Sequence, residues 1–111
     1  MGAFQAFELA DLTRQQSDRG SPYLEFLRRP GMSLGLYRLP VGGTDLQHPH
    51  AADEVYVVLR GRATLRVEGE DHPVQAGSVV SVDQGREHRF VDIVDELELL
   101  VVFAPAETPD A

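Results

Sequence analysis

The sequence predicts an all-β protein built as a single barrel or sandwich of short strands. Segments rich in β-branched and aromatic residues recur along the chain, and turn residues separate them at intervals of about eight to twelve positions. A length of 111 residues suits one domain with one core. The composition, 42% hydrophobic and 25% charged, is that of an ordinary globular protein.

The expected elements follow in chain order. The first twenty residues carry apolar positions at Phe4, Phe7, Leu9 and Leu12 and then turn polar, which predicts an opening strand or arm, with at most a helical turn, followed by a loop. The expected strands are Tyr23–Leu27, Met32–Leu39, Glu54–Arg60, Ala63–Glu68, Val74–Gln75, Ser78–Val82, His88–Ile93 and Leu97–Phe103. Glycine, proline and charged residues lie between them, as expected of turns.

The charge and the missing residue types exclude several functions. The net charge is −8 and no basic run is longer than Arg28-Arg29, which argues against a nucleic-acid partner. All ten basic residues are arginine, so no lysine is present for Schiff-base chemistry. Cysteine is also absent, which rules out disulfides and thiolate ligands. A transition metal would therefore be bound by imidazole and carboxylate groups.

The sequence also indicates no membrane partner. The longest apolar run, Leu97 to Ala104, is too short to cross a bilayer and contains Glu98. The first residues lack the basic and apolar regions of a secretory signal. We therefore expect a cytoplasmic location.

Three side chains with the chemistry of metal ligands share one segment. His48, His50 and Glu54 occupy even positions, and residues two apart in an extended chain point to the same face. Pro49 restrains His48 to an extended conformation and removes one ladder donor, so an irregular strand entry is expected here. His88 begins a later segment and can complete the set from across the barrel.

Three imidazoles and one carboxylate suit a divalent transition metal, with iron, manganese, nickel, copper, cobalt and zinc all possible. In octahedral geometry two coordination positions would remain open for water, dioxygen or a bidentate substrate. Open positions distinguish a catalytic metal site from a closed structural one.

Two stretches resemble the two conserved motifs of the cupin family. From Gly42 the chain reads glycine, five residues, His48-Pro49-His50, three residues, Glu54, six residues and Gly61. From Gly77 it reads glycine, five residues, Asp83-Gln84-Gly85, two residues, His88, three residues and Asp92. Asp83 stands where proline is usual and Asp92 where asparagine is usual, and neither is a ligand position.

This resemblance implies a double-stranded β-helix, or jelly-roll barrel, over about residues 21–105. Residues 1–20 would then form an N-terminal arm and residues 106–111 a flexible tail. The ligand positions of the family fall on His48, His50, Glu54 and His88. Similar cupins often form homodimers, and the final strand is apolar on both faces apart from Glu98, so we expect a homodimer.

Further residues are candidates for a substrate pocket. Tyr56 and Val58 share the parity of Glu54 and should face the barrel interior; Tyr56 is also the candidate catalytic residue, with a pocket wall as the alternative. Phe90 is a second candidate wall. Tyr37 and Arg38 lie on one expected strand, where only one can point inward, and Arg38 would be either an anchor for an acidic substrate or a surface charge. His72 is interpreted as a loop histidine.

The sequence favours the first of three functions, and the other two are alternatives. The first is a non-haem metal oxygenase acting on a small organic molecule, as in similar single-domain cupins. The second is a metal-dependent isomerase, lyase or decarboxylase in which Tyr56 or water moves the proton. The third is a non-catalytic cupin that binds a ligand or a metal.

Overall fold

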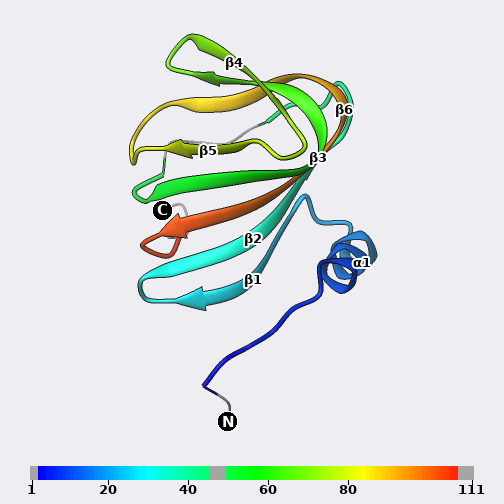
Figure 1. Ribbon diagram of the computed structural model, residues 1–111, viewed down its shortest axis with the longest axis vertical. Coiled ribbons are helices and arrows are strands. Elements are labelled where there is room, and N and C mark those ends of the chain that lie inside the picture. The colour runs from blue at the N-terminus through cyan, green and yellow to red at the C-terminus, as the bar shows by residue number, and fades with distance from the viewer. Residues whose placement is uncertain (1–2, 46–49, 108–111) are drawn as a thin grey trace.

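Strands form most of the computed structural model, which describes residues 3–45 and 50–107 (Figure 1). One helix, α1 (Leu9–Arg19), precedes all the strands. The strands are β1 (Tyr23–Arg29), β2 (Met32–Leu39), β3 (Asp53–Val67), β4 (Glu70–Gln75), β5 (Val79–Val82) and β6 (His88–Ala104). All of the strand pairings in this part of the chain are antiparallel. The predicted all-β class is confirmed.

The two longest strands, β3 and β6, lie side by side within the sheet. Its order is β1-β2-β6-β3-β4, and β5 pairs with the first half of β3. The sequence predicted a break at Gly61, but β3 continues through it with shifts in its register against β6. Gly61 has a φ of +96°, and a Cβ there would lie 2.2 Å from the Glu96 carbonyl oxygen. Glycine therefore permits a bend inside one strand where the sequence indicated a turn between two.

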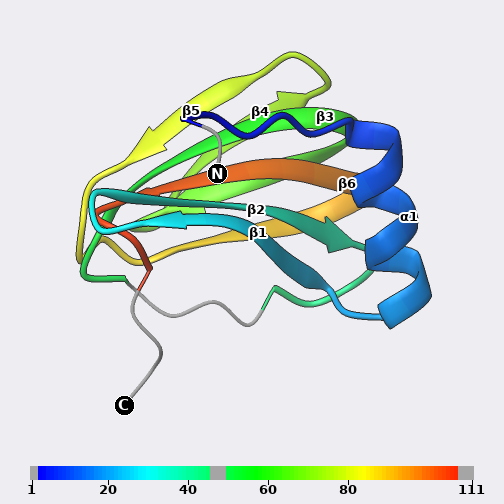
Figure 2. The same ribbon diagram turned by 90° about the horizontal axis from the view of Figure 1, so that it is seen from below.

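The core lies inside the curved sheet. Figure 2 shows the strands wrapped into two facing layers with α1 at one end. Alternate residues of β3 and β6 point into the space between the layers, because side chains alternate across a strand. The buried side chains that they contribute include Tyr56, Val58, Leu65, Phe90, Leu97, Leu99, Val101 and Phe103.

The N-terminal region contains more helix than the sequence predicted. The polar stretch expected to be a loop forms the second half of α1, which buries Leu12 and Gln16 one turn apart. The Gln16 amide donates to the carbonyl oxygens of Pro22 and Leu36, which ties the helix to the sheet. Gly20 ends the helix with a φ of 63°. Because one of the two buried positions is a glutamine, the apolar residues alone do not show the amphipathic pattern of this helix.

The chain after β6 stays attached to the barrel over its first residues. Residues 106–111 were expected to form a flexible tail, but Ala106 is buried and the backbone N–H of Glu107 donates to Ser33 Oγ at 2.9 Å. Residues 108–111 lie outside the described residues. Over the described ranges, no helix combines the length and the apolar character required to cross a membrane.

Candidate metal centre

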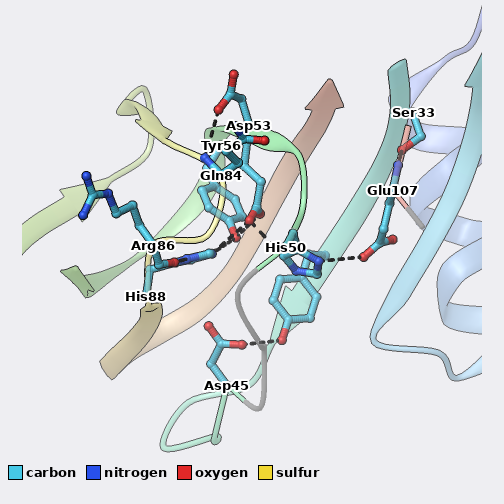
Figure 3. Close-up of polar contacts among 11 residues, drawn as sticks. Ser33, Asp45, His50, Asp53, Tyr56, Gln84, Arg86, His88 and Glu107 are labelled. Carbon is cyan, nitrogen blue, oxygen red and sulfur yellow. Dashed lines mark hydrogen bonds and ion pairs between the residues drawn. The ribbon is translucent and has the colours of Figure 1, made fainter. Parts of the chain in front are cut away.

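Three of the four predicted ligands converge at one end of the barrel. His88 Nε2 lies 3.2 Å from Glu54 Oε1, and His50 Nε2 lies 3.9 Å from the same oxygen. Figure 3 shows His50 and His88 approaching from opposite sides. Glu54 is 2% exposed and His88 is 3% exposed. The fourth predicted ligand, His48, lies outside the described residues.

The backbone around each histidine fixes its position. His88 is the first residue of β6, and its Nδ1 lies 2.9 Å from the Arg86 carbonyl oxygen. Because a carbonyl only accepts, Nδ1 carries the proton, and in the neutral ring Nε2 presents its lone pair to the site. The His50 carbonyl accepts the Gly85 N–H at 2.8 Å, so the turn before His88 also holds His50.

Tyr56 closes the inner side of this cluster. Its hydroxyl donates to Glu54 Oε2 at 2.6 Å and lies 2.9 Å from His88 Nε2. The side chain is fully buried, two residues after Glu54 on the same face of β3. Its ring packs edge-on against Phe90 with the centroids 5.0 Å apart. The hydroxyl is thus within hydrogen-bonding distance of two predicted ligands.

The environment of His88 favours its protonated form when no cation is bound. Burial lowers the pKa of His88. Hydrogen bonds to the Glu54 carboxylate and the Arg86 carbonyl raise it by more, so the net effect is a raised pKa. A cation that binds through Nε2 would displace this proton.

The family model described as "Cupin domain" matches residues 35–104, which include every predicted ligand and both motif stretches. The chain belongs to the cupin family.

The chain is also similar to individual proteins and solved structures. An uncharacterized protein from Streptomyces coelicolor is 47% identical over 104 residues, covering 94% of this chain and 99% of its own length. An oxalate-binding protein from Thermotoga maritima is 33% identical over 67 residues, covering 59% of this chain and 55% of the relative. The cupin from Methanocaldococcus jannaschii, solved as a double-stranded β-helix, has a TM-score of 0.69 at 24% identity and covers 75% of this chain and 78% of that one. The predicted double-stranded β-helix is confirmed.

The described donors suit a cation in their chemistry and separation. Two ligands bonded at about 2.1 Å lie about 3.0 Å apart at a right angle and up to about 4.2 Å apart in line, and both distances to Glu54 Oε1 fall in that range. The buried Nε2 atom of His50 has no hydrogen-bond partner among the described residues. Over residues 3–45 and 50–107, however, no group of three or more histidine and acidic side chains is arranged to hold a metal. Glu54 and His88 contact each other directly, and the predicted set includes His48 outside these ranges.

The candidate pocket residues divide between two faces of the sheet. Phe90 and Val58 are buried in the core, and Tyr37 packs against it. Arg38 points to the other face, where it pairs with Glu98 at 3.2 Å and donates to Ser17 Oγ on α1. Of the two neighbours on β2, Tyr37 therefore faces inward, and the structure does not place Arg38 in the site.

Two acidic residues near the centre were not selected from the sequence. Asp45 is 2% exposed and accepts hydrogen bonds from the Tyr37 hydroxyl and the Phe90 N–H. Burial and this bond to Asp45 raise the pKa of Tyr37. Glu107 places Oε2 at 3.5 Å from His50 Nδ1. Asp45 lies inside the first motif, three residues before His48, whereas no sequence signal marks Glu107.

Proposed function

We propose that this cupin binds one divalent transition metal through His48, His50, Glu54 and His88 and uses it to bind a small chelating organic acid. The observation that carries the proposal is the buried Nε2 of His50, which points toward the Glu54 carboxylate and has no hydrogen-bond partner among residues 3–45 and 50–107. A buried polar atom without a partner is unfavourable, so its retention beside two further donors argues for a ligand.

The charge of the site supports an anionic ligand. Within the proposed ligand set, a divalent cation and the Glu54 carboxylate carry a net charge of about +1, because the three imidazoles are neutral when they act as ligands and the carboxylates of Asp45 and Glu107 are not ligands. The oxalate-binding relative from Thermotoga maritima has the same ligand class in its name. A small carboxylate that chelates through two oxygens fits the two positions that four protein ligands leave open in an octahedral site.

For the reaction, we favour a redox-neutral isomerase, lyase or decarboxylase. The supporting observation is the Tyr56 hydroxyl, which lies within 2.9 Å of both Glu54 and His88 in a fully buried position. A bound cation would supply Lewis-acid polarisation of the substrate. Tyr56 would hold a proton beside the substrate, donate it to a carbon or oxygen atom, and recover it from water.

An oxygenase is the second candidate, because three nitrogen ligands and one carboxylate also suit a redox-active metal such as iron. One experiment separates the two classes. Metal-free protein is loaded in turn with Fe²⁺, Mn²⁺, Ni²⁺ and Zn²⁺ and incubated with small α-hydroxy, α-keto and dicarboxylic acids, with and without oxygen. Product formation and oxygen uptake are recorded in parallel.

Turnover with Zn²⁺ in the absence of oxygen would support the redox-neutral class. Oxygen uptake only with a redox-active metal would support the oxygenase. Tight binding of an acid with no product in any metal form would identify a binding protein. Failure to retain any metal in stoichiometric amount would overturn the proposal as a whole.

A further inference from the structure

Glu107 reaches the proposed metal centre from outside both conserved stretches. Its carboxylate Oε2 lies 3.5 Å from Nδ1 of His50, on the side of the ring opposite Nε2 (Figure 3). Nε2 is the atom that faces Glu54. We infer that Glu107 is a positioning residue that orients His50 and selects the tautomer in which Nε2 can bind a metal. This inference rests on the proposed function.

The position of Glu107 is built into the barrel. Its backbone N–H donates to Ser33 Oγ at 2.9 Å, and Ser33 is fully buried on β2. Its backbone carbonyl accepts from the Arg28 guanidinium, which Glu25 holds through two further hydrogen bonds. Both backbone groups of Glu107 are therefore fixed by the β1–β2 hairpin, and its carboxylate lies beside His50.

Three contacts hold His50, one at its backbone and two at its ring. Its backbone carbonyl accepts the Gly85 N–H, and its ring packs edge-on against Phe103 with the centroids 4.9 Å apart. Glu107 provides the third restraint at Nδ1. Phe103 and Glu107 come from the end of β6 and the segment that follows it, so one stretch of chain sets both the plane of the ring and its rotation.

The chemistry of the pair explains its effect on a metal. An ionised carboxylate can accept a hydrogen bond but cannot donate one, so a carboxylate beside Nδ1 favours the neutral tautomer that carries its proton on Nδ1 and a lone pair on Nε2. The negative charge also makes Nε2 a stronger donor to a cation. His88 obtains the same tautomer from the Arg86 carbonyl. Each histidine thus has an oxygen beside Nδ1, at 2.9 Å for His88 and at 3.5 Å for His50.

The test compares the full-length protein with the variants Glu107→Ala, Glu107→Gln and Ser33→Ala. Glu70→Gln is the matched control, because Glu70 is an exposed carboxylate on the β4 hairpin. Zn²⁺ affinity is measured by competition with a chromophoric chelator. The visible absorption spectrum of the Co²⁺ form reports the ligand geometry. Thermal melting of each metal-free variant shows whether it is folded.

We expect Glu107→Ala to weaken Zn²⁺ binding about 10–100-fold and to change the Co²⁺ spectrum. Glu107→Gln should restore part of the affinity, because its amide oxygen still accepts from Nδ1–H. Ser33→Ala, which leaves the carboxylate in place but releases its backbone anchor, should have a smaller effect. Glu70→Gln should bind like the wild type. Equal affinity and equal spectra for wild type and Glu107→Ala would overturn the inference while leaving the proposed metal site intact.

A measurement without metal keeps the two proposals separate. Long-range ¹H–¹⁵N spectra of the metal-free protein at pH 8 distinguish the tautomers of His50 directly. Wild type should hold the proton on Nδ1, and Glu107→Ala should shift the population toward Nε2. An unchanged tautomer would contradict the positioning role even if the wild-type protein binds no metal.

Discussion

The carboxylate of Asp45 accepts the backbone N–H of Phe90 at 2.8 Å. This single bond joins the loop that leads to His48 with the strand that begins at His88. The second oxygen of Asp45 accepts the Tyr37 hydroxyl at 2.7 Å, so β2 is attached to the same point. Asp45 is therefore a structural link between the two stretches that carry the proposed ligands.

Replacing Asp45 by alanine should destabilise the protein and loosen the metal centre. The change leaves a buried amide and a buried hydroxyl without this acceptor, and each unsatisfied group costs about 1–3 kcal/mol. Urea unfolding of the metal-free protein measures the loss in the free energy of unfolding. Glu70→Ala, at an exposed carboxylate, should be close to neutral. A wild-type unfolding midpoint for Asp45→Ala would show that the link is dispensable.

The proposed metal site predicts that alanine substitutions at different histidines have very different effects on metal content. His50→Ala and His88→Ala should each lose most of the bound metal, since both are proposed ligands. His72→Ala is the matched control, because His72 is exposed on β4. Elemental analysis of protein purified without a histidine tag gives the stoichiometry. Equal metal content in all three variants would contradict the proposed ligand set.

Metal removal should lower the thermal stability of the wild-type protein. A ligand that binds only the folded state at 100 times its dissociation constant adds about 2.7 kcal/mol to the free energy of unfolding. We therefore expect the melting temperature to fall after treatment with a chelator and to recover when Zn²⁺ is added back. His88→Ala should show no such change, because it has lost a ligand. A chelator-insensitive wild type would argue against a bound metal.

The sequence predicted those features of the fold and site that depend on local pattern. The alternation of side chains on β3 was enough to place Glu54, Tyr56 and Val58 on one face, and the spacing of the cupin motifs identified His50 and His88 as neighbours in space. The two-residue alternation of side chains along a strand and the spacing of residues within a motif are both properties of short segments.

The features that the sequence did not predict depend on contacts between residues far apart in the sequence. The bend at Gly61 brings it close to the Glu96 carbonyl, and Glu107 reaches His50 because the chain folds back to Ser33. The register that turned Arg38 outward was likewise set by its pairing with Glu98 on β6. Pairings between segments far apart in sequence are not encoded in any one of them.

Tyr56→Phe tests the proposed proton donor. The variant keeps the ring that packs on Phe90 and removes the hydroxyl beside Glu54 and His88. For the redox-neutral reaction we expect turnover to fall about 10²–10⁴-fold, with metal content unchanged. Metal content is the control, because it should match the wild type if only the proton donor is lost. Full activity of Tyr56→Phe would remove Tyr56 from the mechanism.

Gly61→Ala tests the bend in β3. The φ of +96° is unfavourable for alanine, and the added Cβ would meet the Glu96 carbonyl oxygen at 2.2 Å. Strain of this kind costs about 1–3 kcal/mol, and the backbone contact adds to it. Gly31→Ala, with open space around its Cβ position, should change the stability by less than about 0.5 kcal/mol. Equal unfolding curves for the two variants would show that the bend can relax.

We propose that the expected homodimer forms through one face of the sheet. Val57 on β3 lies between Val79 on β5 and Leu100 on β6, and all three share the outward side. Val79 is 68% exposed, whereas Val57 and Leu100 are half-buried. An apolar row that crosses three strands is unfavourable in water and would gain stability against a second copy of the same face, where a two-fold axis pairs like with like.

Light scattering should therefore give twice the 12.3 kDa mass of the chain for the wild type. Val57→Asp should give the mass of one chain, because a carboxylate in the centre of the row would be buried without a partner. Val94→Asp is the control: Val94 is 54% exposed near the bend of β6 and lies outside this row. A monomeric wild type would contradict the homodimer, and a dimeric Val57→Asp would place the interface elsewhere on the barrel.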